Sequence, residues 1–130
     1  MAITNQFGLS SQQILKSNRG YWAASGQIDA STNAKPVILI TNIGQRDSIA
    51  TVTFGGSVED SDLTAGTYSK VECIVDVDIV YQVKVNSLDG MNPYFTEFSI
   101  FVPARTSLRI DITDADTTGK HTTLLRGYWL

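Results

Sequence analysis

The 130-residue chain has little of what enzyme and metal sites are commonly built from. It contains one cysteine, one histidine and three glutamates. These counts exclude multi-histidine and multi-cysteine metal sites, and they leave a single possible cysteine–histidine pair for nucleophilic catalysis. No Gly-x-Ser-x-Gly motif, phosphate-binding loop or dinucleotide fingerprint occurs in the sequence. We therefore expect a protein that is not an enzyme and has no catalytic residue, cofactor or metal.

The chain also lacks clustered positive charge and long hydrophobic runs. Its ten lysines and arginines are scattered, the net charge is −3 and the pI is about 4.9. Proteins that bind nucleic acid through phosphates usually carry a basic patch, so we expect no nucleic-acid partner. The longest apolar runs, such as Val37–Ile40, are far shorter than the ~20 residues that cross a membrane. The first residues show no signal-peptide pattern, so we expect synthesis in the cytoplasm and no membrane partner.

What the chain does contain favours β-structure. Valine, isoleucine and threonine together make 36 residues, and β-branched side chains pack well on a pleated surface. From Tyr21 onward, hydrophobic residues alternate with polar ones. Residues 36–43 and 48–54 read as a hairpin, and the alternation over 67–86 reads as one strand that is bent by a bulge near 76–78 and passes between two sheets. The fold prediction is all-β: an antiparallel two-sheet β-sandwich, jelly-roll-like.

The beginning of the chain differs from the rest. Ser10 and Gln13 have the spacing of a helix capping box, which predicts a short helix over about 11–17. We therefore divide the chain into an N-terminal arm with a short helix, residues 1–18, and a β-sandwich domain, residues 19–130.

Three isolated residues or motifs have an ordinary structural interpretation. Asp114–Gly119 matches the first six positions of an EF-hand calcium loop, but the twelfth position is Leu125 rather than glutamate. We interpret it as a turn, with a weak calcium or magnesium site as the alternative. His121 is expected to be exposed at a strand edge, and Cys73 to be a buried, unreactive side chain.

One tetrapeptide occurs twice and contains both tryptophans. Arg19-Gly20-Tyr21-Trp22 recurs as Arg126-Gly127-Tyr128-Trp129. Arginine, tyrosine and tryptophan are enriched in the energetic centres of interfaces, and each copy should direct one aromatic side chain inward and one outward. The strand over 94–102 has aromatic residues on both faces, which indicates that a partner or the arm covers one of them. The predicted interface residues are Ile14, Leu15, Arg19, Tyr21, Trp22, Phe95, Phe101, Arg126, Tyr128 and Trp129.

Several segments resemble a known group of proteins. Val37-Ile-Leu-Ile-Thr-Asn-Ile-Gly44, Ala50-Thr-Val-Thr53, Val102-Pro-Ala-Arg-Thr-Ser-Leu-Arg-Ile110 and Leu125-Arg-Gly-Tyr-Trp-Leu130 are similar to segments of small β-sandwich virion structural proteins of tailed bacteriophages, such as capsid decoration or cement proteins. The resemblance covers about two-thirds of the chain. It assigns no role to any single residue.

The resemblance implies a structural role in a virion. We expect a non-enzymatic protein that decorates or stabilises a phage capsid or head–tail assembly through protein–protein contacts, made in the host cytoplasm and located in the virion. Its expected partners are the major capsid protein or another virion protein, and a homo-oligomer, with a trimer favoured. The alternative is a carbohydrate-binding module or receptor-binding accessory that uses exposed tryptophan and tyrosine. A small hydrolase is the third and least favoured reading.

Overall fold

Strands make up the regular structure of the described part of the chain. The computed structural model describes residues 2–4, 12–57, 68–86, 94–115 and 119–130. The strands are β1 (Ala2–Thr4), β2 (Gln13–Lys16), β3 (Gly20–Ala24), β4 (Ile28–Asp29), β5 (Lys35–Ile40), β6 (Ser48–Ser57), β7 (Tyr68–Val75), β8 (Asp78–Asn86), β9 (Tyr94–Val102), β10 (Leu108–Asp114) and β11 (Lys120–Trp129). These ranges contain no helix, and therefore none long and apolar enough to span a membrane.

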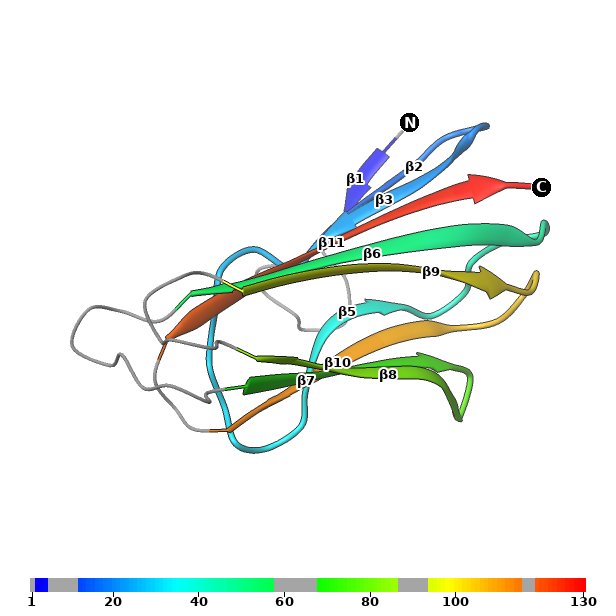
Figure 1. The fold of residues 1–130 in the computed structure, drawn as a ribbon. Coiled ribbons are helices and arrows are strands. Elements are labelled where there is room, and N and C mark those ends of the chain that lie inside the picture. Colours follow the sequence, from blue (N-terminus) through cyan, green and yellow to red (C-terminus); the bar gives the residue numbers. More distant parts are fainter. Residues whose placement is uncertain (1, 5–11, 58–67, 87–93, 116–118) are drawn as a thin grey trace.

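The strands form two sheets that face each other (Figure 1). The larger sheet has the order β1-β2-β3-β11-β6-β9, with β4 added beside β11, and the smaller has the order β5-β10-β7-β8. Each paired strand is antiparallel to its neighbour. If β3 and β5–β11 are numbered in chain order, the sheets read first-eighth-third-sixth and second-seventh-fourth-fifth. This is the order of an eight-stranded jelly roll, so the predicted fold class is confirmed.

The core lies between the sheets and consists of alternate residues from both. Ile38, Ile110 and Val71 of the smaller sheet and Val52 and Leu125 of the larger one are fully buried. Most of their neighbours in sequence face outward, as the period of two in a strand requires, but Val37 beside Ile38 is also buried. Cys73 belongs to the same core, which confirms the prediction that it is buried, and burial raises the pKa of its thiol to about 12.

The predicted helix over 11–17 is wrong, because β2 occupies Gln13–Lys16. β2 pairs with β1 and β3, and Ile14 points into the core. The side chain of Gln12 is buried, and its Oε1 accepts a hydrogen bond from the backbone N–H of Leu39 in the other sheet. A weak capping pattern cannot compete with sheet pairing on both sides and a buried isoleucine. Residues 1 and 5–11 of the predicted arm lie outside the described residues, and the division at residue 18 stays a prediction.

The long alternating segment is a hairpin within one sheet, not a bent strand that passes between sheets. β7 and β8 pair through a tight turn at Asp76 and Val77, in which Asp76 has a φ of 56°. Aspartate tolerates this left-handed conformation better than most residues. A bulge does occur, but it lies at Cys73 and Ile74 in the β7–β8 register. The two-residue turn alone would place even-numbered residues of β8 opposite odd-numbered residues of β7. The bulge shifts the register by one residue, so Cys73 lies opposite Tyr81 and Val71 opposite Val83. Odd-numbered residues therefore share one face in both strands, and the sequence alternates without a break across the turn.

Candidate functional site

The two Arg-Gly-Tyr-Trp segments lie side by side on neighbouring strands. β3 carries the first, β11 carries the second, and the two strands pair in antiparallel register. Tyr21 lies opposite Gly127, and Tyr128 lies opposite Gly20. Each tyrosine therefore faces a residue without a side chain. The repeat brings its two copies together at one place in the larger sheet.

One aromatic side chain of each copy points into the sandwich. Tyr21 is only 5% exposed, and its hydroxyl shares a hydrogen bond with Ser48 Oγ at 2.9 Å. Burial raises the pKa of the Tyr21 phenol. The Trp129 ring packs against Tyr21 with ring centroids 5.0 Å apart, and its Nε1 donates to the Ser17 carbonyl at 2.9 Å. Tyr21 and Trp129 therefore have a structural role in the packing of the larger sheet against the core.

The other aromatic of each copy points outward. Leu15, Trp22 and Arg126 lie side by side across β2, β3 and β11. Tyr128, Ile49 and Phe101 lie side by side across β11, β6 and β9. Residues that are directly opposed on neighbouring strands share a face of the sheet. We call this surface of the larger sheet, made by Leu15, Trp22, Ile49, Phe95, Phe101, Leu124, Arg126 and Tyr128, the contact face.

A hollow of about 200 Å³ lies at one end of the contact face. It is lined by Leu15, Ser17, Arg19, Gly20, Tyr21, Trp22, Arg126, Gly127 and Tyr128. A Cβ atom on Gly20 would lie 1.9 Å from the carbonyl oxygen of Gly127, so no larger residue fits there without moving the backbone. Leucine and aromatic side chains surround the two glycines, and two arginines add charge. The hollow can accept an apolar group that carries negative charge.

The charge at the hollow is positive although the whole chain is acidic. Arg126 Nη2 lies 3.6 Å from Glu97 Oε2, and both groups are about half exposed. Glu97 also accepts a hydrogen bond from Thr53 Oγ1 at 2.8 Å. Among the described residues, no acidic group lies within ion-pair distance of Arg19. The hollow therefore carries more positive than negative charge.

The structure places the ten predicted interface residues in three positions. Leu15, Trp22, Phe95, Phe101, Arg126 and Tyr128 belong to the contact face, and Arg19 lies at the rim of its hollow. Ile14, Tyr21 and Trp129 are on the inner side and pack with the core. The sequence interpretation missed the exposed hydrophobic residues at the β7–β8 turn, Val77, Ile79 and Val80. Their signal was Val77 between Asp76 and Asp78, with the consecutive apolar residues Ile79 and Val80 directly after it, which the bent-strand interpretation concealed.

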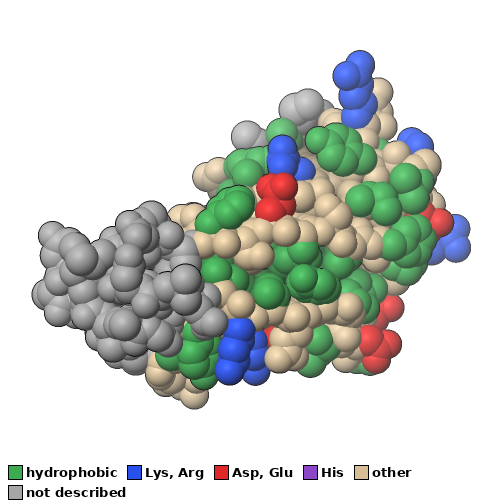
Figure 2. Space-filling view, in the orientation of Figure 1, with side chains coloured by type: hydrophobic (Ala, Val, Ile, Leu, Met, Phe, Trp, Pro, Cys, Tyr) green, Lys and Arg blue, Asp and Glu red, His purple; other side chains and the backbone are tan. Residues whose placement is uncertain are grey.

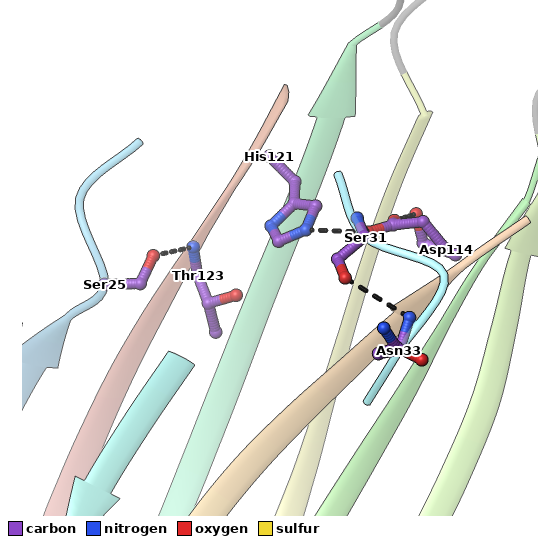
Figure 3. Close-up of polar contacts among 7 residues, drawn as sticks. Ser25, Ser31, Asn33, Asp114, His121 and Thr123 are labelled. Atoms are coloured by element: carbon purple, nitrogen blue, oxygen red, sulfur yellow. Dashed lines mark hydrogen bonds and ion pairs between the residues drawn. The ribbon is translucent and has the colours of Figure 1, made fainter. Parts of the chain in front are cut away.

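A second cluster, of polar residues, is buried between the sheets (Figure 3). Asp114 Oδ2 accepts from the backbone N–H of Ser31 at 2.8 Å and lies 3.2 Å from His121 Nε2. Asp114 Oδ1 accepts from Ser69 Oγ at 2.5 Å. His121 is 3% exposed, so the prediction of an exposed histidine is wrong.

The contacts in this cluster are those of a buried structural hydrogen-bond network rather than those of a catalytic triad or a calcium site. Burial alone would raise the pKa of Asp114, but hydrogen bonds from His121, Ser69 and Ser31 together hold that pKa below its ordinary value. The hydroxyl of Ser69 donates to the carboxylate, whereas a nucleophilic serine would be hydrogen-bonded to the imidazole. Both carboxylate oxygens of Asp114 face inward to protein donors, away from a calcium-loop geometry. Residues 116–118 of the predicted loop lie outside the described residues, and the rest of the described chain holds no group of three potential metal ligands.

The fold defines a jelly-roll sandwich, and solved structures share it. The infectious bursal disease virus VP2 subviral particle is similar over 85% of this chain, with a TM-score of 0.55 and 12% identity. A structure of the infectious bursal disease virus Gx strain is similar over 91%, with a TM-score of 0.50 and 13% identity. This chain spans about a third of each, 32% and 33%. A family GH115 4-O-methyl-alpha-glucuronidase, of which this chain covers 14%, has a TM-score of 0.41 and 10% identity, which is too low to carry an argument. No protein-family model and no curated protein sequence matches the chain.

Proposed function

We propose that this protein is a non-enzymatic structural component of a virion, which decorates or stabilises a phage capsid or head–tail assembly through its contact face. The observation that carries the proposal is the make-up of that face: Trp22, Tyr128 and Phe101 are presented outward on one sheet together with Arg126. Exposed aromatic residues and arginines that gather on one rigid surface are the usual centre of a protein–protein interface.

The outer face of the smaller sheet provides the contrast. It carries the ion pairs Arg109–Asp111, at 3.0 Å, and Lys70–Glu72, at 3.6 Å, on adjacent strands. Paired charges are costly to desolvate and are depleted from interface centres. The contact face also carries one such pair, Arg126–Glu97 at 3.6 Å, so the two outer faces differ chiefly in the outward aromatic residues of the contact face, Phe101 and Tyr128.

The fold supports a place in a particle. The VP2 structures with the same fold come from a viral particle, although jelly rolls also occur in lectins and other proteins, so the fold alone does not decide. The resemblance to small virion proteins of tailed bacteriophages narrows the proposal to a phage assembly. Its partners would be the major capsid protein or another virion protein, together with further copies of this chain.

Co-sedimentation with empty capsids from the same source tests the proposal. The wild-type protein should sediment with the particles, and the variant Trp22→Ala/Tyr128→Ala should bind them more than tenfold more weakly, since removing two interface-centre aromatics costs about 2 kcal/mol or more. The matched control is Gln82→Ala/Lys84→Ala on the outer face of the smaller sheet, which should bind as wild type. Absence of the wild-type protein from the particles, or equal loss in both variants, would refute the proposed role.

The hollow supports one alternative, a carbohydrate-binding or receptor-binding accessory. Trp22 and Tyr128 offer ring faces to a sugar, and Arg19 and Arg126 offer hydrogen-bond donors. A strictly monomeric protein that binds glycans, and loses them in the Trp22→Ala variant, would favour this alternative over the structural role.

A further inference from the structure

The β7–β8 turn displays a hydrophobic side chain between two acids. Val77 is 89% exposed at the apex, and Asp76 and Asp78 are exposed on either side of it. Isolated exposed valines are common on protein surfaces, but this one adjoins Ile79 and Val80, which are 55% and 47% exposed. The turn therefore ends the hairpin in an apolar knob with a negative rim. We call Asp76, Val77 and Asp78 the acidic tip.

The acidic tip is held in place rather than left loose. The backbone N–H of Asp76 donates to the carbonyl of Ser107 at 3.0 Å, and the backbone N–H of Ser107 donates back to Asp76 Oδ1 at 2.9 Å. These reciprocal bonds fix the turn to the residue that precedes β10. A fixed projection loses little conformational freedom when it binds, so the tip is organised in advance for a contact.

The surface beside the tip is also apolar. A cavity of about 380 Å³ is lined by Val75, Asp76, Asp78, Val80, Phe101, Pro103 and Thr106. Figure 2 shows hydrophobic side chains across the edge of the sandwich where β8 and β9 lie, as far as the end where β9 finishes. Phe101 belongs to both this surface and the contact face, so the two are continuous. A partner seated at the tip would therefore also cover part of this edge.

The hollow on the contact face has the complementary character. It is apolar at its floor and carries Arg19 and Arg126, whereas the tip is apolar at its apex and carries Asp76 and Asp78. The tip belongs to the smaller sheet, and the hollow is lined by residues of β2, β3 and β11 in the larger sheet. The two sheets face each other with the core between them (Figure 1). A chain cannot place its own tip into its own hollow. The complement must come from another molecule.

We propose that the acidic tip of one copy docks into the hollow of a second copy, with Val77 in the apolar floor and Asp78 facing Arg19. Such a contact is head-to-tail, because each copy offers one tip and one hollow. Head-to-tail contacts close into a ring when the rotation between copies allows it, and a ring of three would give the expected trimer. The inference rests on the proposed function in that the hollow is part of the contact face, and it names the occupant of that part.

Two variants of the full chain each disrupt one side of the proposed contact, either the tip or the hollow. The tip variant is Val77→Ser/Asp78→Lys, which leaves the Asp76–Ser107 bonds in place. The hollow variant is Arg19→Gln/Arg126→Gln, which removes the positive charge without creating an acid that could pair with the lysine of the tip variant. Both changes affect exposed side chains, and unchanged unfolding midpoints verify that each variant is folded. The control, Gln82→Lys, adds a positive charge to the same hairpin away from the tip.

Light scattering and sedimentation velocity over a concentration series give the test. We expect the wild type and Gln82→Lys to form oligomers that weaken as salt is raised, and each variant alone to associate at least tenfold more weakly. An equimolar mixture of the two variants should form a one-to-one dimer and nothing larger, because it contains one intact tip and one intact hollow per pair. A monomeric wild type, oligomers insensitive to both variants, or a mixture that stays monomeric would overturn the proposal.

Failure of the tip-to-hollow contact and failure of the proposed role in a particle give different results. A wild-type protein that is monomeric and still sediments with capsids would overturn the tip-to-hollow contact and leave the role standing. A protein that assembles through its tip and does not bind capsids would do the reverse.

Discussion

The two copies of Arg-Gly-Tyr-Trp have the same residues and opposite orientations. In the first copy the tyrosine is buried and the tryptophan lies on the contact face. In the second copy Tyr128 is 59% exposed and Trp129 packs against the core. Because side chains alternate in a strand, the orientation of one residue decides that of the whole segment. The comparison separates what a tyrosine contributes to the fold from what it contributes to a surface.

The antiparallel register explains why both orientations occur together. Tyr21 fills the space above Gly127 on the inner side, and Tyr128 lies beside Gly20 on the outer side. In this register only one tyrosine of the pair has the inner position, and the other faces outward on the contact face. The segment is therefore both a structural unit and a source of the contact face.

The largest effect that we predict is on stability, and it should separate the two tyrosines. Tyr21→Ala should lower the free energy of unfolding by about 3–5 kcal/mol, because it leaves a cavity against Trp129 and removes the partner of Ser48. Tyr128→Ala should change it by less than about 0.5 kcal/mol, since the side chain is largely in water. Urea unfolding of both variants measures the difference. Equal losses would mean that the copies are not distinguished by burial.

The second predicted effect is on the pH dependence of stability. It compares the contacts made by β3 and β11, the two strands that carry the Arg-Gly-Tyr-Trp copies. β3 is tied to β11 by the neutral pair Ser25–Thr123, whereas β11 is tied to the smaller sheet through His121 and the carboxylate of Asp114. The pKa of Asp114 is lower in the folded chain than in the unfolded one, so its stabilisation is present at neutral pH and is lost as the pH falls below about 4. Asp114→Asn should cost about 1.5–3 kcal/mol at pH 7, the range for hydrogen bonds to a charged group.

Unfolding midpoints measured from pH 7 down to pH 3 verify this second prediction. The wild type should lose stability over the lower part of the range, and Asp114→Asn should lose less over the same interval. Asp29→Asn, at an exposed carboxylate on β4 whose pair with Lys120 lies at the surface, is the control and should follow the wild type. If Asp114→Asn has the same acid dependence as the wild type, the carboxylate does not provide the pH-sensitive link.

Much of the fold could be predicted from the pattern of residues, because the information is local. The alternation over β6, β9, β10 and β11 predicts strands, and the amount of alternating structure predicts a sandwich. The predicted hairpin of residues 36–43 and 48–54 is wrong, because β5 pairs with β10 in the smaller sheet and β6 pairs with β9 and β11 in the larger one. The helix prediction failed because the capping pattern is local, whereas the pairing of β2 with β3 depends on residues that are distant in space. The bent strand was predicted because neither glycine nor proline marks the turn at Asp76.

The contact face could be predicted only in part. The sequence identifies Trp22, Phe101 and Tyr128 as residues suited to an interface, but it cannot place them on one face, because that depends on the register between four strands. The sequence also does not indicate that Tyr21 is buried whereas Tyr128 is exposed. The acidic tip was missed for a related reason: Val77 has the parity of a core residue, and only the turn exposes it.

The smallest effect that we predict tests the space on which the two orientations depend. A Cβ atom on Gly127 would lie 2.1–2.5 Å from ring atoms of Tyr21, so Gly127→Ala must displace a ring held by Ser48 and Trp129, at a cost of about 1–3 kcal/mol. Gly55 on the adjacent strand β6 has open space around its Cβ position, so Gly55→Ala should be neutral or stabilise by up to about 1 kcal/mol. Opposite signs in urea unfolding would show that the missing side chain at Gly127 is what admits Tyr21 to the core. Equal changes would mean that the strands themselves, rather than the space above Gly127, set the orientation of the segment.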